Sequence, residues 1–241
     1  MNISYSKIND FNTCPKKYQL IHIDKKLPEE KQNIYSAFGT AIHYAIEQTI
    51  NKDFDLDLTT TYFKNKFDEL FDEIPLTKSQ LIFKEEWYYK GKQMLTYFYN
   101  NIYDVVKEGV IETEKYFSYE IDKDIFLNGL IDIIFKNEKK EIELWDWKTG
   151  KKMPKKDNFQ LRIYALCYYK LFGEVPSNIR YIFLKNNTEN QTCVNADILE
   201  RTKEELLKII QEIKQRTEQN NFDRKINKSC MYCPVRKFCE Q

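Results

Sequence analysis

Residues 128–135 read NGLIDIIF, and residues 142–148 read IELWDWK. Both runs are rich in β-branched and aromatic residues and have the length of strands. Because strand side chains alternate between two faces, Asp132 falls on an apolar face of the first strand, and Asp146 and Lys148 share an apolar face of the second. A carboxylate on such a face is costly to bury unless it is paired or binds a metal.

These three charged residues indicate a metal site. Two carboxylates on adjacent strands can share a divalent cation, and a lysine beside them can hold an attacking water or steady a developing phosphate charge. The alternative is a buried Asp–Lys pair that closes a sheet edge, and either strand alone is compatible with it. The two strands together favour the metal site, with Asp132, Asp146 and Lys148 at its centre.

The rest of the chain predicts helices around these strands. Apolar residues recur at helical spacing in 37–50, 63–74 and 81–102, and Ser6 is expected to cap a short helix that ends at Cys14-Pro15. Extended segments are expected at 110–121, 125–135, 141–148, 179–185 and 191–197, and helices at 157–172 and after a capping box Thr202-x-x-Glu205. This order indicates an α/β or α+β domain with a helical insertion.

Composition excludes several classes of protein. A net charge of +1 over 241 residues is no global sign of nucleic-acid binding, so any such signal must be local. The sequence shows neither a signal peptide nor an apolar run that could span a membrane, so we expect a cytoplasmic protein. The six glycines include no Walker A loop, which excludes an ATP-driven helicase.

Three cysteines lie within ten residues near the end of the chain: Cys230, Cys233 and Cys239. In the cytoplasm such a cluster indicates metal rather than disulfides. Two thiolates three positions apart can reach one metal centre, and Cys14 is the candidate fourth ligand. Cys167 and Cys193 have no partner at a suitable spacing and are expected to be small buried residues. At this point zinc and an iron–sulfur cluster remain equally open.

Basic residues gather in two places. One run follows the second strand directly: Lys148, Lys151, Lys152, Lys155 and Lys156. The tail 222–239 holds the other, with five basic residues against the single acid Asp223. A run of charged residues usually marks only a solvent-exposed surface of the protein. Because these two flank the expected metal site and the cysteines, we expect Lys151, Lys152, Lys155 and Lys156 to bind DNA phosphates.

Five motifs in order resemble the PD-(D/E)xK nuclease superfamily, specifically its RecB-like branch. Gly129-x-x-Asp132 followed by Asp146-Trp147-Lys148 resembles its signature, although Ile131 stands where a literal motif has proline. Residues 39–43 (GTAIH) resemble its upstream histidine motif, and residues 160–164 (QLRIY) resemble its Q-x-x-x-Y motif. The opening Ser6-x-Ile8-x-x-Phe11-x-x-Cys14-Pro15 and the terminal cysteines resemble the iron–sulfur members, which include CRISPR adaptation nucleases and the nuclease parts of recombination helicases.

The resemblance, which spans residues 4–239, implies a restriction-endonuclease-like fold with a central mixed sheet flanked by helices. It implies one nuclease domain over 1–241, made of a helical subdomain at about 36–108, a nuclease core at about 109–200, and a cysteine cluster of Cys14 and segment 222–239 that joins the two termini. The cluster implied is a structural 4Fe–4S centre on Cys14, Cys230, Cys233 and Cys239, with zinc as the alternative.

The resemblance also implies roles for individual residues. His43, Asp132, Asp146 and the Trp147 backbone carbonyl would ligate Mn²⁺ or Mg²⁺, and Lys148 would be catalytic. Gln160 and Tyr164, four apart on one helix face, would position the DNA backbone or the lysine.

The implied function is a metal-dependent exonuclease that hydrolyses phosphodiesters of single-stranded DNA or of DNA ends. Its setting would be CRISPR adaptation, or recombination or phage replication, with the protein partners of such a complex. The alternatives are a non-catalytic DNA-end-binding or assembly subunit, and an endonuclease, which could be zinc-stabilised. Intact Asp132, Asp146 and Lys148 argue against a non-catalytic subunit, because a pure binder has no need of a buried carboxylate pair.

Overall fold

The computed structural model of the chain describes residues 1–26, 33–74, 83–150 and 158–239. It divides into two compact units. Unit 1 comprises Met1–Lys31, Phe117–Gly129 and Asp197–Gln241, and unit 2 comprises Gln32–Tyr116 and Leu130–Ala196.

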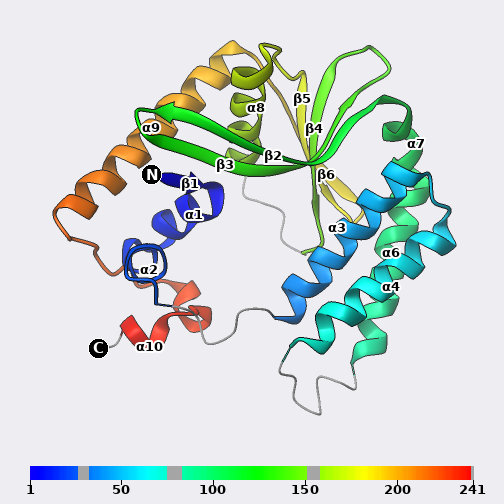
Figure 1. Ribbon diagram of the computed structural model, residues 1–241, viewed down its shortest axis with the longest axis horizontal. Coiled ribbons are helices and arrows are strands. Elements are labelled where there is room, and N and C mark those ends of the chain that lie inside the picture. Colours follow the sequence, from blue (N-terminus) through cyan, green and yellow to red (C-terminus); the bar gives the residue numbers. More distant parts are fainter. Residues whose placement is uncertain (27–32, 75–82, 151–157, 240–241) are drawn as a thin grey trace. The chain divides into compact units, whose positions relative to one another are not determined.

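The described residues form a six-stranded mixed sheet (Figure 1). Its strands are β1 (Asn2–Ser4), β2 (Val110–Asp122), β3 (Ile125–Lys136), β4 (Ile142–Lys148), β5 (Asn178–Phe183) and β6 (Thr188–Cys193). Their order is β1-β3-β4-β5-β6, with β2 paired to β3. The pairs β1–β3 and β4–β5 are parallel, whereas β3–β4 and β5–β6 are antiparallel. The predicted α/β fold with a central mixed sheet is confirmed.

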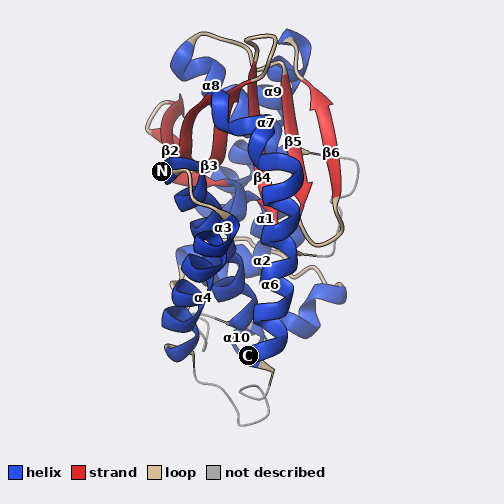
Figure 2. Ribbon diagram, turned by 90° about the vertical axis from the view of Figure 1, so that its right-hand side faces the viewer, coloured by secondary structure: helices blue, strands red, loops and turns tan. Residues whose placement is uncertain are grey.

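In unit 2, three helices build the main hydrophobic core: α3 (Ile34–Lys52), α4 (Leu56–Asp72) and α6 (Lys84–Phe98) (Figure 2). Their aromatic side chains, including Phe38 and Phe98, pack in one cluster with Trp145 and Trp147 of β4. Because side chains alternate along β4, Asp146 and Lys148 lie on the opposite face of the sheet. The segments η2 (Tyr99–Tyr103), α7 (Asp104–Val106) and η3 (Lys107–Gly109) then lead into β2.

Helix α8 (Phe159–Phe172) connects β4 to β5 and packs against both strands. Parallel neighbours need such a crossover, and a helix commonly supplies it. The predicted helix at 157–172 is therefore confirmed over its described part, and so is the helix predicted at 37–50. The latter extends further, because the side chain of Asn33 accepts hydrogen bonds from the backbone N–H groups of Tyr35 and Ser36 and so begins α3 earlier.

Unit 1 contains α1 (Tyr5–Thr13), α2 (Pro15–Tyr18), η1 (Gln19–Ile23), α9 (Ala196–Glu218), η4 (Lys228–Tyr232) and α10 (Arg236–Cys239). Its first and last segments meet in a small aromatic cluster, in which Tyr18 contacts Phe11 edge-on and stacks on Phe222. The backbone N–H of Lys16 also donates to the carbonyl of Asp223. Residues more than 200 positions apart in the sequence are thus packed together within this unit.

Three expected element boundaries were wrong. The cap of α1 is Ser4, not Ser6, because the Ser4 hydroxyl accepts the bond from the Lys7 N–H. Helix α9 begins at Ala196, so Thr202 lies inside it and donates to the carbonyl of Ile198 instead of capping. Strand β6 occupies 188–193, not 191–197, since this largely exposed edge strand carries no apolar alternation to mark it.

Among the described residues, none of the helices has the length and apolar character that crossing a bilayer requires.

Candidate active site

The site lies in unit 2, where the antiparallel pairing of β3 with β4 ends. Ile133 is the last β3 residue paired across to β4, opposite Trp145, so the next residues on the two strands are Asp132 and Asp146. The Asp132 side chain accepts a hydrogen bond of 2.7 Å from the Trp147 N–H, in place of a backbone partner. Both carboxylates are buried. The structure thus places these two residues next to each other on adjacent strands.

Asp146 is held in an unfavourable electrostatic position. Burial, together with the negative charge of Asp132, raises the pKa of Asp146 to about 7, against the opposing influence of Lys148 and His43. Its Oδ2 lies 2.6 Å from Nζ of Lys148. Apart from that ion pair, Oδ2 makes no hydrogen bond with the described residues. A buried carboxylate oxygen with spare lone pairs next to a second carboxylate is what a cation site requires.

His43 reaches the same place from α3. Its Nε2 lies 3.1 Å from the Trp147 carbonyl oxygen, and its Nδ1 lies 3.4 Å from Oδ2 of Asp132. Burial alone would lower the pKa of the imidazole, but the carboxylates of Asp132 and Glu114 raise it well above its usual value. Gly39, one turn earlier on α3, lies close to the end of β4, where a Cβ would make ordinary van der Waals contact with the Thr149 hydroxyl at 3.5 Å.

The groups expected as ligands lie at this end of the β3–β4 pair, and the possible ligand atoms that come within 4.8 Å of one another there belong to His43, Asp132 and Glu114. An imidazole nitrogen, two carboxylates and a carbonyl oxygen are ligands that Mn²⁺ accepts, and all but the imidazole suit Mg²⁺ as well. The donor set fits a divalent cation.

A chain of hydrogen bonds holds Lys148 on the α8 face. Its Nζ donates to Oε1 of Gln160 at 3.3 Å, and Nε2 of Gln160 donates to the Tyr164 hydroxyl at 2.7 Å. The Tyr181 hydroxyl donates to the same Gln160 oxygen at 3.1 Å, and the lysine ammonium lies 4.9 Å from the centre of the Tyr181 ring. Gln160 thus contacts both the lysine and Tyr164, and Tyr164 reaches the lysine through Gln160.

Sequence reasoning missed two residues of the site. Tyr181 could have been found, because it lies opposite Asp146 in the parallel pairing of β4 with β5. Glu114 of β2 gave no such signal. Its carboxylate forms a group with His43 and Asp132 in which one possible ligand atom from each lies within 4.8 Å of the others. Glu114 and His43 also line an open hollow of about 510 Å³ next to the site.

The four lysines expected to bind DNA, Lys151, Lys152, Lys155 and Lys156, lie outside the residues that the structure describes.

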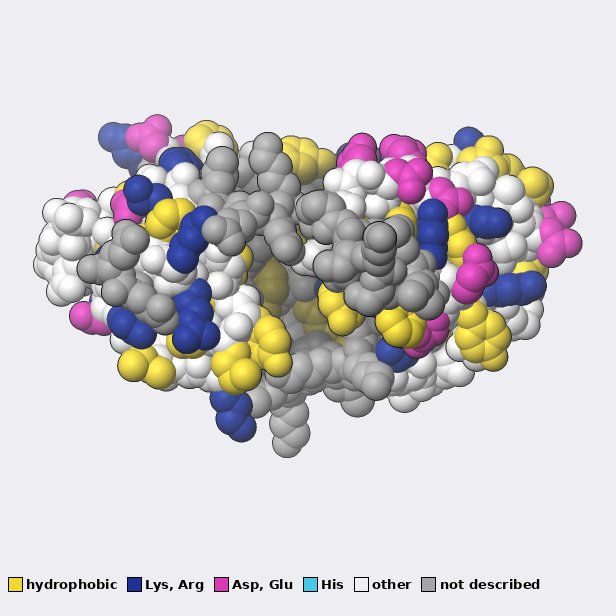
Figure 3. All heavy atoms as spheres, turned by 90° about the horizontal axis from the view of Figure 1, so that it is seen from below, with side chains coloured by type: hydrophobic (Ala, Val, Ile, Leu, Met, Phe, Trp, Pro, Cys, Tyr) yellow, Lys and Arg dark blue, Asp and Glu magenta, His cyan; other side chains and the backbone are white. Residues whose placement is uncertain are grey.

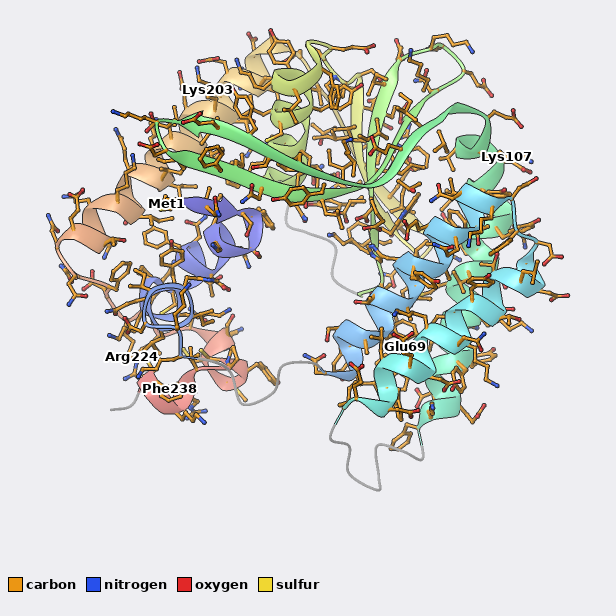
Figure 4. All side chains as sticks on the ribbon, in the orientation of Figure 1. Met1, Glu69, Lys107, Lys203, Arg224 and Phe238 are labelled. Carbon is orange, nitrogen blue, oxygen red and sulfur yellow. The ribbon has the colours of Figure 1, made fainter. Side chains whose placement is uncertain are left out.

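The four cysteines meet in unit 1. Cys14, Cys230, Cys233 and Cys239 all line one cavity of about 390 Å³. Backbone N–H groups donate to two of the sulfurs at 3.4 Å, from Lys225 to Cys14 and from Asn227 to Cys230. Figure 4 labels two residues of this terminal segment, Arg224, which also lines the cavity, and Phe238 of α10. The structure thus brings these four cysteines to one cavity, and their metal is treated below.

The surface of this end of unit 1 is both basic and apolar. Arg224, Lys225 and Lys228 are exposed beside the uncovered side chains of Met231 and Tyr232. Where η4 and α10 face the viewer in Figure 3, basic and hydrophobic side chains lie next to each other. Basic side chains with an exposed aromatic ring are features that suit a nucleic-acid strand.

Comparison with known proteins bears on the family of the chain. The profile of the PD-(D/E)XK nuclease superfamily matches residues 2–240. The chain is 24% identical over 267 residues to the Gene 69 protein of Mycobacterium phage D29, across 98% of this chain and 95% of that protein. The crystal structure of a protein from Eubacterium rectale, provisionally named an exonuclease, superposes on this chain with a TM-score of 0.57 at 11% identity. The superposition covers 96% of this chain and 87% of the other, and it supports the fold. The chain belongs to the PD-(D/E)XK nuclease superfamily.

Proposed function

We propose that this chain is a metal-dependent DNA exonuclease of the RecB-like branch, which hydrolyses phosphodiester bonds of single-stranded DNA or of DNA ends. The observation that carries the proposal is the pair of buried carboxylates, Asp132 and Asp146, between Lys148 and His43. Nucleases of this superfamily use divalent metals, and the donor set of the site fits one. We propose His43, Asp132, Asp146 and the Trp147 carbonyl as its ligands.

The residues of the site divide the work of hydrolysis. A bound divalent cation would polarise a phosphoryl oxygen and lower the pKa of a coordinated water. Besides the cation, Lys148 is the positive group of the site. Its Nζ donates a hydrogen bond to the attacking water, or to a phosphate oxygen on which negative charge develops. Gln160, Tyr164 and Tyr181 fix the ammonium through the bonds described above, so that it need not reorganise during the reaction.

We propose further that the four cysteines hold a structural 4Fe–4S cluster. Among the described residues, the group of three possible metal ligands within 4.8 Å of one another is the His43 group, so no three of the cysteine sulfurs are all that close together. A single zinc ion with bonds of about 2.3 Å would draw its sulfurs to within roughly 4 Å of one another. A cluster binds each cysteine through a different iron, and wider spacing suits it.

We propose that the units form one functional nuclease domain over 1–241, with the helical part at about 36–108, the core at about 109–200 and the cluster on Cys14 and 222–239. The profile match from 2 to 240 supports this, since it includes both units. The role is CRISPR adaptation, or recombination or phage replication. The phage relative, which matches over 95% of its own length, favours a role in phage replication, with the protein partners of such a complex.

The test of the function is an assay of purified protein on linear and circular single-stranded DNA of the same sequence, with Mn²⁺ or Mg²⁺. We expect the linear strand to be degraded to short products and the circle to stay intact, because an exonuclease needs an end. Cleavage of the circle would identify an endonuclease. Binding to ends without hydrolysis under any metal would identify the non-catalytic end-binding subunit instead.

A second experiment tests the ligand set. We expect Mn²⁺ to support faster cleavage than Mg²⁺, because an imidazole suits Mn²⁺ better than Mg²⁺, which prefers an all-oxygen shell. His43→Ala should lower activity at limiting Mn²⁺ by at least about tenfold and narrow the Mn²⁺-to-Mg²⁺ ratio. Metal titrations on one linear substrate measure both.

The matched control for that experiment is His22→Ala. His22 is the other histidine of the chain, and it pairs with Asp10 in unit 1. It should leave the metal dependence unchanged. If His43→Ala keeps the wild-type rates and the same metal ratio, His43 is not a ligand.

A further inference from the structure

Glu114 has an unusual backbone conformation for its place in the fold. Seven non-glycine residues among those described have a positive φ. Six of them follow helices or lie in the turns between strands, whereas Glu114, with a φ of 47°, lies inside strand β2. A left-handed residue other than glycine is rare within a strand. Such conformations persist where the surrounding structure holds them in place, and they gather at functional sites.

The residue at this position reaches the histidine of the site. Oε1 of Glu114 lies 3.7 Å from Nδ1 of His43. The other ring nitrogen, Nε2, faces the Trp147 carbonyl at 3.1 Å. The two nitrogens of one ring therefore have different surroundings, with a proposed metal ligand beside Nε2 and carboxylates beside Nδ1.

Asp132 is the other carboxylate near Nδ1, at 3.4 Å. The same Asp132 oxygen already accepts the bond from the Trp147 N–H, and in the proposed site this carboxylate also serves the cation. Among the described residues Glu114 accepts no such backbone hydrogen bond, and its side chain is partly exposed at 22%. It is therefore the carboxylate left to accept a hydrogen bond from Nδ1 once a cation is bound.

We propose that Glu114 is a positioning residue of the metal site. Its carboxylate accepts the Nδ1 proton of His43, which leaves Nε2 unprotonated and directed toward the cation. A metal-bound histidine commonly donates its second N–H to a carboxylate, which fixes both the tautomer and the ring. This inference rests on the proposed function, because it requires His43 to be a metal ligand.

The first test measures Mn²⁺ binding to the full-length protein without DNA. Glu114→Gly removes the carboxylate, and its backbone adopts the φ of 47° without strain. We expect it to weaken Mn²⁺ binding by about 10–100-fold. Glu114→Gln should lose less, because its amide oxygen still accepts a hydrogen bond. Glu112→Ala is the control, since Glu112 lies on the same strand and pairs with Lys115 at the surface, and it should bind Mn²⁺ like wild type.

A double-mutant cycle with His43→Ala separates positioning from direct ligation. If Glu114 acts through His43, adding Glu114→Gly to His43→Ala should change the Mn²⁺ dissociation constant by less than about twofold. A further loss of the full size would overturn the inference, because Glu114 would then act on the cation itself. Unchanged binding in Glu114→Gly with weakened binding in His43→Ala would also overturn it, while leaving the proposed metal site intact. Unchanged binding in His43→Ala would instead show that His43 is not a ligand, and the inference would fall with it.

Nitrogen NMR of the two histidine rings gives a readout that a purely structural role would not move. In the Mg²⁺-bound protein we expect His43 to be protonated at Nδ1 and bound through Nε2, with His22 as the internal reference. Glu114→Gln should keep this tautomer and Glu114→Gly should lose it. The same single tautomer in both variants would contradict the proposal.

Discussion

Asp146→Asn is expected to lower the rate of DNA hydrolysis by at least about 10³-fold, which corresponds to roughly 4 kcal/mol of transition-state stabilisation. The substitution keeps the size of the side chain but removes the negative charge that would hold the cation and that pairs with Lys148 at 2.6 Å. DNA affinity should stay within a few-fold, because it depends on basic side chains elsewhere. Single-turnover cleavage and binding to the same labelled strand measure the two quantities.

The control for this substitution is Asp104→Asn. Asp104 is exposed and pairs with Lys107 at the surface, a contact that contributes little to stability. It should leave both cleavage and binding unchanged. Activity of Asp146→Asn close to that of wild type would remove Asp146 from the mechanism.

The same variant should be more stable than wild type when metal is removed with a chelator. The pKa of Asp146 is raised to about 7 in the folded protein by burial and by Asp132. The folded chain thus holds this proton more tightly than the unfolded chain, and the stability so gained is lost as the pH rises from about 4 through about 7. The raised pKa of His43 acts with the same sign at higher pH.

Asparagine imitates the protonated carboxyl and escapes this loss. We therefore expect Asp146→Asn to exceed wild type in free energy of unfolding by at least roughly 1 kcal/mol at pH 8, since each pKa unit corresponds to about 1.4 kcal/mol. The difference should shrink toward pH 4. Urea unfolding in the presence of chelator at several pH values measures it. A variant less stable than wild type at pH 8 would show that Asp146 pairs favourably without metal.

Strand alternation predicted the centre of the site because its signal is local. Asp132 and Asp146 stand on faces defined by their immediate neighbours, and the period of two carries that information along seven or eight residues. The antiparallel register then brings the two together. The position of His43 depends on contacts across 104 residues, and only the resemblance to a family of nucleases indicated it.

Other features leave no trace in local patterns. Glu114 reaches His43 through a left-handed residue within a strand, which alternation cannot predict. Helix α9 starts before its expected cap. Thr202 is buried at helical spacing between Leu199 and Leu206, so it belongs to the buried face of the helix. From the sequence alone, its hydroxyl suggested an N-cap. Strand β6 is polar on both faces, and its pairing with β5 alone defines it.

Cys14→Ala is expected to abolish the proposed cluster and to destabilise unit 1. Anaerobically purified wild type should be brown, contain iron and sulfide, and bleach on loss of the cluster, whereas the variant should be colourless. The segment after α9 has few buried apolar side chains, with Phe222 and Val235 as its buried hydrophobic residues. We therefore expect metal binding to supply much of the free energy that folds it.

The size of the effect follows from that shortage of apolar contacts. Structural metal sites in small domains contribute on the order of 10 kcal/mol. If only about 4 kcal/mol is lost, the melting temperature of a chain of this length should fall by roughly 8–16 °C. The expected burial of Cys193 was wrong, because it is an exposed residue of the edge strand β6 in unit 2. Cys193→Ala is therefore the control, and it should change neither colour nor stability.

Elemental analysis separates the metals. Stoichiometric zinc without iron in anaerobic protein would refute the cluster while leaving the four cysteines as ligands. A colourless wild type of unchanged stability after treatment with chelator would refute a metal at these cysteines altogether. The N–H groups of Lys225 and Asn227 already point at the sulfurs of Cys14 and Cys230, as thiolates bound to a metal require for their remaining charge. Because Cys14 precedes α2 and the other three cysteines follow α9, loss of this one thiol should release the terminal segment from the start of the chain.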